Sequence, residues 1–395
     1  MSGDRHVRLG LNPFRRLADL LAPHQPKAGL EPIRLTAGDP TLGPPAFVPD
    51  ILQREAALWA DYPPTEGTPQ FRQAAVDWLT RRYQLPAGML DQARHVLPAP
   101  GSREGLFMLA LAVVPEQKAG QRPVVLLPNP FYHVYRASSV ISGAEPVFLD
   151  ATRANGFLPD LDAIPESVLQ RTALFFLCSP SNPQGAIASA EYLDRALSLA
   201  RQYDFVLAVD ECYAEIYTDT PPPGGLEAAA RSGSLDHLVV LHSLSKRSSA
   251  PGLRSGFVAG CPAVIRRHLQ VIEYGGAGVP GPIQAASVAL WEDEAHVPPT
   301  RTFYRELIDE AERVLGNRFG FYRPPGGFFL WLEVGDGEAA ALKLWTEAAV
   351  RVLPGGYLTA PAPDGSNHGD PFIRVAMIHP KPITAEALRR MAEVL

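Results

Sequence analysis

The chain has 395 residues, of which 46% are hydrophobic, so it can bury a large core in two or three domain-sized units. Its formal net charge of -6 argues against nucleic acid as the main partner, because a phosphate backbone selects a basic face. The three cysteines, Cys178, Cys212 and Cys261, are far apart and have no CxxC spacing. This spacing argues against a disulfide framework and against a structural zinc site.

The sequence shows no pattern of a targeting or membrane-spanning segment. Residues 1–20 carry charges throughout and have no apolar core of the kind found in signal peptides. The most apolar stretch, residues 106–115, is much shorter than the ~20 residues that a spanning helix needs. We therefore expect a protein of the reducing cytoplasm that binds no membrane and no metal.

Residues 1–44 are rich in proline and glycine and contain one short helical pattern, at 14–21. Further along the chain, short apolar runs alternate with amphipathic stretches. We expect strands at 124–128, 146–149, 173–178, 205–210, 238–242 and 256–259, with helices at 132–142 and 190–203. This alternation is typical of an α/β fold with a mostly parallel sheet.

The last hundred residues follow a different pattern. We expect a helix at 291–315, a strand at 327–334, a helix at 338–350, a strand at 372–376 and a helix at 384–394. The sequence thus predicts a large domain over 45–290 and a smaller α+β domain formed by 1–44 and 291–395. Because ligands of parallel sheets bind beyond the carboxyl ends of the strands, the residues after each strand are the first candidates for a site.

Polar side chains follow three of the central strands. Those after the successive strands are Asn182, then Asp210 and Tyr213, then Ser243, Ser245, Lys246 and Arg254. Pyridoxal phosphate (PLP) requires such a set: an amine for a covalent bond, an acid facing its pyridine nitrogen, and a cationic, hydroxyl-rich cradle for its phosphate.

The ordered motifs N-P-x-G, D-x-x-Y, S-x-S-K and P-G-x-R stand at 182–185, 210–213, 243–246 and 251–254. With them the chain resembles the fold-type I PLP-dependent aminotransferases of class I/II, from about Leu35 to Ala376. The most specific stretch is S-L-S-K-R-S-S-A-P-G-L-R-S-G-F-V-A-G at 243–260. Together with G-S-R-E-G-L-F at 101–107 and N-P-F-Y at 129–132, this stretch is similar in sequence to N-succinyldiaminopimelate aminotransferases of lysine biosynthesis.

The resemblance implies three catalytic residues, Lys246, Asp210 and Tyr213. Lys246 would bind the cofactor covalently and later move the proton of the substrate Cα. Asp210 would keep the pyridine nitrogen protonated. Tyr213, together with Asn182, would donate hydrogen bonds to the phenolic oxygen of the cofactor.

The resemblance also implies which residues bind the rest of the cofactor and the substrate. Tyr132 would stack on the pyridine ring, and Arg374 would grip the α-carboxylate of the substrate through paired hydrogen bonds. Gly38 and Asn182 would approach the substrate. The phosphate would be held by Arg254, Ser243, Ser245 and the backbone N–H groups of Ser102 and Arg103 at a helix start.

Tyr62 matches the tyrosine that reaches a phosphate in the neighbouring subunit, so we expect a homodimer with shared active sites. Phe71 stands where the family usually has leucine. His133 and His242 flank the motifs, and surface or supporting positions are expected for them. Cys178 and Cys212 are expected to pack as small apolar side chains.

The resemblance implies transamination between glutamate and a 2-oxo acid, with N-succinyl-LL-2,6-diaminopimelate and 2-oxoglutarate as the expected pair. Arg103 is a candidate for the distal carboxylate, or else it is solvated or paired with a glutamate. An aspartate-like aminotransferase is a weaker alternative, because residues 278–282 contain no basic side chain. A PLP β-lyase would use the same cofactor residues. A non-catalytic PLP-binding regulator would need a basic DNA-binding segment, which residues 1–44 do not provide.

Overall fold

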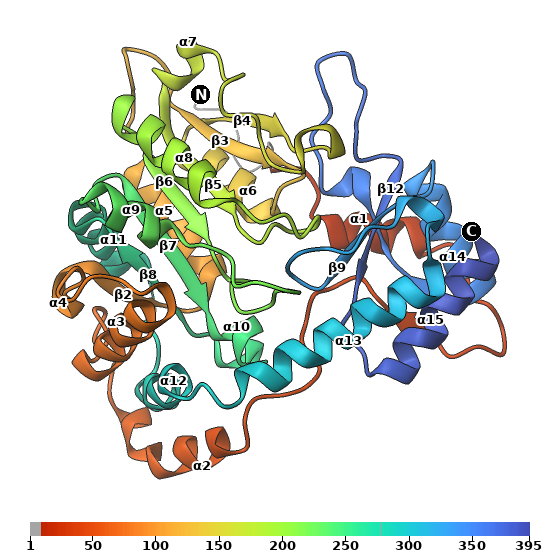
Figure 1. Ribbon diagram of the computed structural model, residues 1–395, viewed down its shortest axis with the longest axis horizontal. Coiled ribbons are helices and arrows are strands. Elements are labelled where there is room, and N and C mark those ends of the chain that lie inside the picture. Colours follow the sequence, from red (N-terminus) through yellow and green to blue (C-terminus); the bar gives the residue numbers. More distant parts are fainter. Residues whose placement is uncertain (1–8, 277) are drawn as a thin grey trace.

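A seven-stranded sheet lies at the centre of the larger part of the molecule, at the left of Figure 1. The computed structural model describes residues 9–276 and 278–395. The strand order is β2-β8-β7-β6-β5-β3-β4, and β8 runs antiparallel to both neighbours while all other neighbours are parallel. The strands are β2 (Val96–Ala99), β3 (Val124–Asn129), β4 (Glu145–Asp150), β5 (Thr172–Cys178), β6 (Val206–Asp210), β7 (Leu238–Ser243) and β8 (Gly256–Gly260). The predicted mostly parallel sheet is confirmed.

Helices cover both faces of this sheet, and the strands are apolar on both sides for that reason. Along β5, Leu174 and Phe176 join the core on one face, whereas Phe175 and Leu177 join the core on the other. One face packs against α5 (Ser102–Val113), α6 (His133–Ile141) and α11 (Pro262–Gly275). The other packs against α3 (Pro69–Tyr83), α8 (Ala190–Gln202), α9 (Gly225–Ser232) and α12 (Gly281–Glu292).

The smaller part, at the right of Figure 1, is built from both ends of the chain. Near the start of the chain, β1 (Ile33–Arg34) pairs in parallel with β10 (Val350–Arg351). An antiparallel sheet has the order β11-β12-β9. The elements are β9 (Phe329–Glu333), β11 (Leu353–Pro354), β12 (Phe372–Ala376), α1 (Pro13–Leu21), α13 (Val297–Leu315), α14 (Gly337–Ala348) and α15 (Lys381–Val394).

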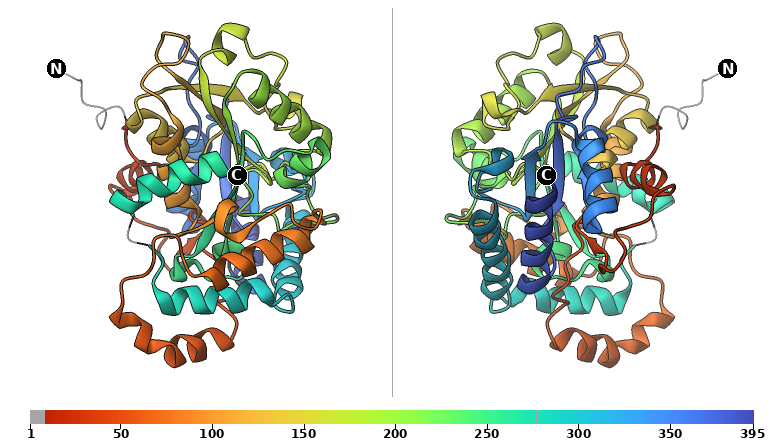
Figure 2. Two further views of the ribbon diagram at one scale, coloured as in Figure 1. Left: turned by 90° about the vertical axis from the view of Figure 1, so that its left-hand side faces the viewer. Right: turned by 90° about the vertical axis from the view of Figure 1, so that its right-hand side faces the viewer.

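Short elements connect these layers. They are α2 (Phe47–Arg54), α4 (Gln92–His95), α7 (Glu166–Leu169), α10 (Leu244–Arg247) and the 3-10 helices Ala56–Ala60, Arg153–Asn155, Pro251–Leu253, Arg318–Gly320 and Gly355–Tyr357. In both views of Figure 2, α2 lies at one end of the molecule, where it contacts α12. No helix in the described part of the chain has the length and apolar character to cross a membrane.

The helix predicted at 291–315 is wrong at its beginning. Residues 291 and 292 end α12, and α13 begins at Val297 after a break. In the break, the side chain of Asp293 accepts a hydrogen bond from the His296 backbone N–H at 3.1 Å. Pro298 and Pro299 follow in the first turn of α13, where a missing N–H costs nothing. The division of the chain at residues 44 and 290 stays a prediction. Residues 1–8 lie outside the described residues. They belong to the predicted small domain and to the region that we expect to contain no signal peptide.

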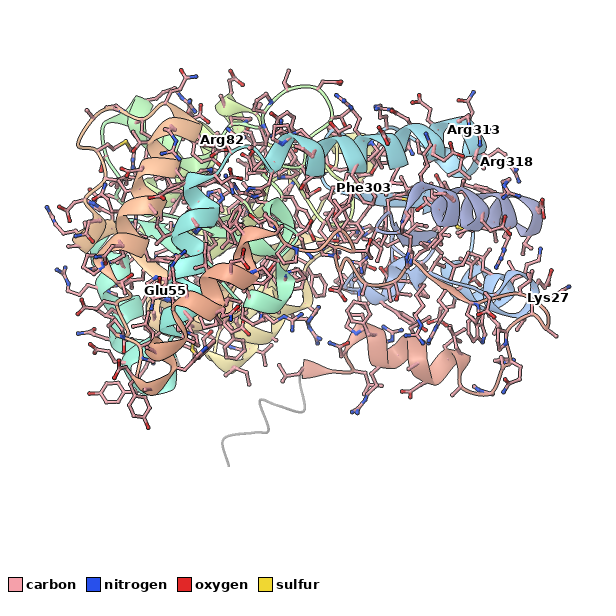
Figure 3. All side chains as sticks on the ribbon, turned by 90° about the horizontal axis from the view of Figure 1, so that it is seen from below. Lys27, Glu55, Arg82, Phe303, Arg313 and Arg318 are labelled. Atoms are coloured by element: carbon pink, nitrogen blue, oxygen red, sulfur yellow. The ribbon has the colours of Figure 1, made fainter. Side chains whose placement is uncertain are left out.

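A buried carboxylate ties α13 to the larger part. Glu215, 7% exposed, follows β6 and forms ion pairs with Arg82 of α3 and, at 3.0 Å, with Arg301 of α13. Seen from below, Arg82 lies beside the first turns of α13 (Figure 3). Removing this carboxylate would leave two largely buried guanidinium groups without a counter-ion.

We therefore expect the substitution Glu215→Gln to lower the free energy of unfolding by about 3 kcal/mol, because breaking a buried pair leaves an uncompensated charge. Denaturant-induced unfolding followed by circular dichroism would measure the loss. The control is Asp162→Asn, which breaks an exposed pair with Arg195 and should cost less than about 1 kcal/mol. Equal stability of the two variants would contradict the assigned role of Glu215.

Candidate active site

A cavity of about 460 Å³ lies beyond the carboxyl ends of the central strands and is bordered on the other side by the smaller part. Every predicted site residue except Tyr62 lines it. These residues are Gly38, Ser102, Arg103, Tyr132, Asn182, Asp210, Tyr213, Ser243, Ser245, Lys246, Arg254 and Arg374. Tyr62 is fully exposed and lies outside the cavity. Its predicted contact with a neighbouring subunit stays a prediction.

Lys246 enters the cavity from α10, the short helix that follows β7. The helix is capped by Ser243, whose hydroxyl accepts a hydrogen bond from the Ser245 N–H at 3.2 Å. The Lys246 amine donates to the carbonyl of Gly38 and forms no ion pair with a carboxylate of the described residues. Burial lowers the pKa of this amine, so the neutral form that can attack a carbonyl carbon is easier to reach than in a solvated lysine.

Asp210 ends β6 and is 3% exposed. Its Oδ2 accepts a hydrogen bond from the hydroxyl of Tyr135 at 2.8 Å, and its Oδ1 accepts one from the Cys212 N–H at 3.2 Å. Burial raises the pKa of this carboxyl, and the two hydrogen bonds oppose that effect by stabilising the ionised form. No cation of the described chain forms an ion pair with Asp210, so a cationic ligand atom would complete its surroundings.

Arg374 lies on β12, across the cavity from these strands, and is 5% exposed. Its terminal nitrogens donate to Asn182 Oδ1 at 3.0 Å and to the Thr36 carbonyl at 2.7 Å, while its buried Nε has no hydrogen-bond partner. Burial lowers its pKa to about 10. In the described residues no carboxylate pairs with it. A buried cation in this state needs an anion, and a ligand carboxylate supplies one.

A helix start and two hydroxyls form the third corner of the cavity. No side chain caps the N-terminus of α5 at Gly101, and a Cβ there would lie 2.6 Å from a terminal nitrogen of Arg254, which only glycine avoids. The hydroxyls of Ser243 and Ser245 are 2.9 Å apart. Arg254 donates to Glu104 Oε2 at 2.9 Å, so an anion bound here would share the guanidinium with that carboxylate. Free helix N–H groups, hydroxyls and a guanidinium are suitable phosphate ligands.

Two tyrosines complete the walls. The hydroxyl of Tyr132 accepts a hydrogen bond from Arg103 Nε at 3.0 Å, which joins the first turn of α5 to the start of α6. Tyr213 is buried edge-on against the rings of Phe328 and Phe329. Burial raises the pKa of the Tyr213 hydroxyl, so it remains a proton donor. Asn182 accepts its hydrogen bond from Arg374 through Oδ1, which leaves its NH₂ group as a donor.

These side chains fit pyridoxal phosphate. The buried Lys246 amine can bond to its aldehyde carbon, the unpaired Asp210 carboxylate can face its protonated ring nitrogen, and the uncapped helix start with Arg254 can hold its phosphate. Tyr213 and the Asn182 amide supply donors for its phenolic oxygen. The fit rests on Lys246 and Asp210, which form no ion pair with the described residues, and on a helix start that no side chain caps.

Several residues of the cavity were not predicted from the sequence. Tyr135, the donor to Asp210, lies three residues after Tyr132 on α6, and this spacing could have placed both on one side of the helix. Phe14, on α1, could not have been found because it is distant in sequence. His133 was expected at the surface or in support, yet it lines the cavity, and burial lowers its pKa to about 4. Cys178 belongs to the core as expected but also faces the cavity, as does Cys212.

Comparison with known proteins shows the family to which this chain belongs. The 4-dedimethylamino-4-oxo-anhydrotetracycline transaminase OxyQ of Streptomyces rimosus is 33% identical, over 91% of this chain and 93% of its own length. The LL-diaminopimelate aminotransferase of Desulforudis audaxviator is 32% identical, over 96% and 94% of the two chains. The crystal structure of an aminotransferase from Neisseria meningitidis has 36% identity and a TM-score of 0.92, covering 98% of each chain. The family model for aminotransferases of class I and II matches residues 31–391. The chain belongs to this family of PLP-dependent, fold-type I enzymes and is an aminotransferase.

Proposed function

We propose that this aminotransferase exchanges amino groups between glutamate and a 2-oxo acid whose long side chain ends in a carboxylate. The pair we favour is N-succinyl-LL-2,6-diaminopimelate with 2-oxoglutarate, in lysine biosynthesis. The observation that carries the proposal is the buried Arg374 guanidinium, which pairs with no acid of the described residues and faces the same cavity as the partly buried Lys246 amine. An α-carboxylate bound to Arg374 places the substrate Cα within the space that Lys246 borders.

Each residue then has a task that follows from its surroundings. Arg374 holds the α-carboxylate and so fixes which Cα bond is broken. Lys246 Nζ would take the proton from Cα and deliver it to the former aldehyde carbon of the cofactor, and the lowered pKa of the amine favours its proton-accepting form. Asp210 holds the proton on the ring nitrogen by charge. When bound, pyridoxal phosphate supplies the electron-accepting ring and the carbon that carries the amino group between the two substrates.

The choice of a long, acidic side chain rests on Arg103. Its guanidinium donates to Tyr132 through Nε and is exposed at the wall of the cavity, and it forms no ion pair with a carboxylate of the described residues. Its terminal nitrogens are thus available to an anion that reaches beyond the cofactor. The name of the Desulforudis audaxviator relative, LL-diaminopimelate aminotransferase, supports a substrate of this length. The sequence around Lys246 favours the N-succinyl derivative of diaminopimelate.

Three alternatives are less well supported. A substrate as short as aspartate would need a distal cation nearer the reacting carbon, and residues 278–282 contain none. A β-lyase would release pyruvate and ammonia, and the transaminase and aminotransferase names of the relatives weigh against it. A regulator without turnover is opposed by the complete set of acid, amine and guanidinium in one cavity.

We also infer a homodimer with shared sites. Tyr62 is fully exposed, and Trp59 and Leu58 near it are 54% and 38% exposed, as expected for a surface that a second subunit covers. Sedimentation at micromolar concentration tests the homodimer, and a monomer with full activity would contradict the shared sites.

We place the protein in a reducing cytoplasm, in keeping with its three free cysteines, and we propose no nucleic acid or membrane as partner.

An absorbance scan of the purified protein tests the reaction. Glutamate should bleach the visible band of the cofactor, and the oxo acid derived from N-succinyl-diaminopimelate should restore it while oxaloacetate does not. Recovery with oxaloacetate alone would overturn the substrate proposal. A band that no amino acid bleaches would overturn transamination with glutamate.

The substitution Lys246→Ala should lower the rate of transamination about a thousandfold or more, because the proton of Cα then has no base at that position. Noncovalent contacts should still retain the cofactor, which equilibrium dialysis would measure. The control is Lys118→Ala, which removes another partly buried lysine with a lowered pKa, away from the cavity. Substantial activity in the Lys246 variant would overturn the mechanism.

The substitution Arg103→Gln should raise the KM for N-succinyl-diaminopimelate about tenfold or more, because a charge-assisted hydrogen bond to the distal carboxylate is lost. A straight-chain apolar amino acid of similar length should react at the same rate with both proteins. The rate with this apolar substrate shows whether losing the hydrogen bond to Tyr132 has disturbed the cavity in general. The control Arg195→Gln removes an exposed arginine on α8. An equal loss with both substrates would contradict the distal role.

A further inference from the structure

The buried carboxylate of Asp210 is oriented by a phenol. Tyr135 of α6 is fully buried and donates from its hydroxyl to Asp210 Oδ2 at 2.8 Å. We propose that Tyr135 is a positioning residue, which keeps Asp210 ionised and aimed at the ring nitrogen of the cofactor. This inference rests on the proposed role of Asp210 in the reaction, and it assigns a task to a residue outside the family motifs of this chain.

The hydroxyl of Tyr135 has little freedom. Its ring is stacked on Phe176 of β5, with the centroids 4.8 Å apart and the planes inclined by 11°. Tyr132, the residue just before α6, packs edge-on against it, at 5.6 Å and 86°. Because the ring is held on two sides, the hydroxyl oxygen stays at one point and the hydrogen bond to Asp210 has one direction.

The two hydrogen bonds of Asp210 divide the carboxylate between protein and ligand. The Cys212 N–H takes one lone pair of Oδ1, and the Tyr135 hydroxyl takes one lone pair of Oδ2. Each oxygen keeps a second lone pair. The protein bonds therefore fix the rotation of the carboxylate and still leave it an acceptor for an N–H group in the cavity.

A neutral donor suits this position better than a cation. A buried acid without hydrogen bonds would take up a proton and could no longer hold a second proton on a ring nitrogen. An arginine or lysine here would keep the acid ionised, but its charge would oppose a protonated ring nearby. A phenol stabilises the carboxylate and adds no positive charge, and the pKa of the Tyr135 hydroxyl is raised by burial, so it keeps its proton.

The test is the substitution Tyr135→Phe, which removes the hydroxyl and keeps the stacked ring. We expect pyridoxamine phosphate, which binds without the covalent bond to Lys246, to bind about tenfold or more weakly, because one hydrogen bond to a charged group is lost. Nitrogen NMR of ring-labelled cofactor should show a smaller protonated fraction than in the unmodified protein. A merely structural role would leave the protonation of the ring nitrogen unchanged.

The matched control is Tyr192→Phe. The Tyr192 hydroxyl also donates a 2.8 Å hydrogen bond, but to the Pro159 carbonyl on a surface away from the cavity. Both variants lose one hydroxyl from a largely buried ring, so thermal melting separates a general loss of stability from a change at the ring nitrogen. The control should bind pyridoxamine phosphate as the unmodified protein does.

The variant Asp210→Asn distinguishes the failure of this inference from the failure of the proposed mechanism. If Asp210→Asn lowers ring protonation and Tyr135→Phe does not, the role of Tyr135 is overturned while that of Asp210 stands. If Asp210→Asn leaves ring protonation unchanged, the role of Asp210 falls, and that of Tyr135 with it. In the Asp210→Asn background, Tyr135→Phe should cause no further loss of protonation, because its effect passes through the carboxylate.

Discussion

Three ionisable side chains line one cavity and have few partners within the protein, and the rest of the structure serves this arrangement. Lys246, Asp210 and Arg374 are each largely removed from solvent, and none forms an ion pair with an opposite charge of the described chain. Placing ionisable groups in this way costs free energy that the two apolar cores must offset. A ligand with an aldehyde, a cationic ring nitrogen and a carboxylate-bearing partner supplies what each of them lacks. The site is therefore most stable when it is loaded, since any ligand that binds the folded state stabilises it.

The sheet makes this separation possible because successive side chains point to opposite faces. Asp210 and Glu211 are neighbours at the end of β6, yet their carboxylates have different surroundings. Glu211 accepts hydrogen bonds from the Tyr83 hydroxyl at 2.8 Å and the Gly225 N–H at 2.7 Å, and His242 Nε2 lies 2.7 Å away. Its oxygens are satisfied within the protein. Only Asp210 keeps an acceptor directed at the cavity, so position on the pleat decides which of two adjacent acids can bind a ligand.

The sequence allowed the central sheet and most of the cavity to be predicted because both depend on local order. Apolar runs mark the strands, and the residues after them, such as Asn182 and Lys246, must lie at one edge. Tyr135 and Phe14 do not follow a strand, so this rule does not assign them, although the spacing from Tyr132 was a signal for Tyr135. Tyr135 belongs to the cavity only because α6 packs with one particular side against β5, and Phe14 only because α1 folds back from the start of the chain. The early start predicted for α13 has the same origin, since the hydrophobic pattern runs through the break that Asp293 and the following prolines create.

The substrate half of the cavity depends on joining segments that are more than three hundred residues apart. The Ala376 N–H of β12 donates to the Leu35 carbonyl at 2.8 Å, and Arg374 donates to the Thr36 carbonyl, so the loop with Gly38 and the strand with Arg374 hold one another in place. Arg374 also reaches Asn182 on the larger part. Because Oδ1 of Asn182 is occupied by this bond, its NH₂ group is the half that remains for the cofactor. The Asn182 amide thus contacts Arg374 through its oxygen and can contact the cofactor through its NH₂ group. A movement of the smaller part relative to the larger part would therefore change both contacts.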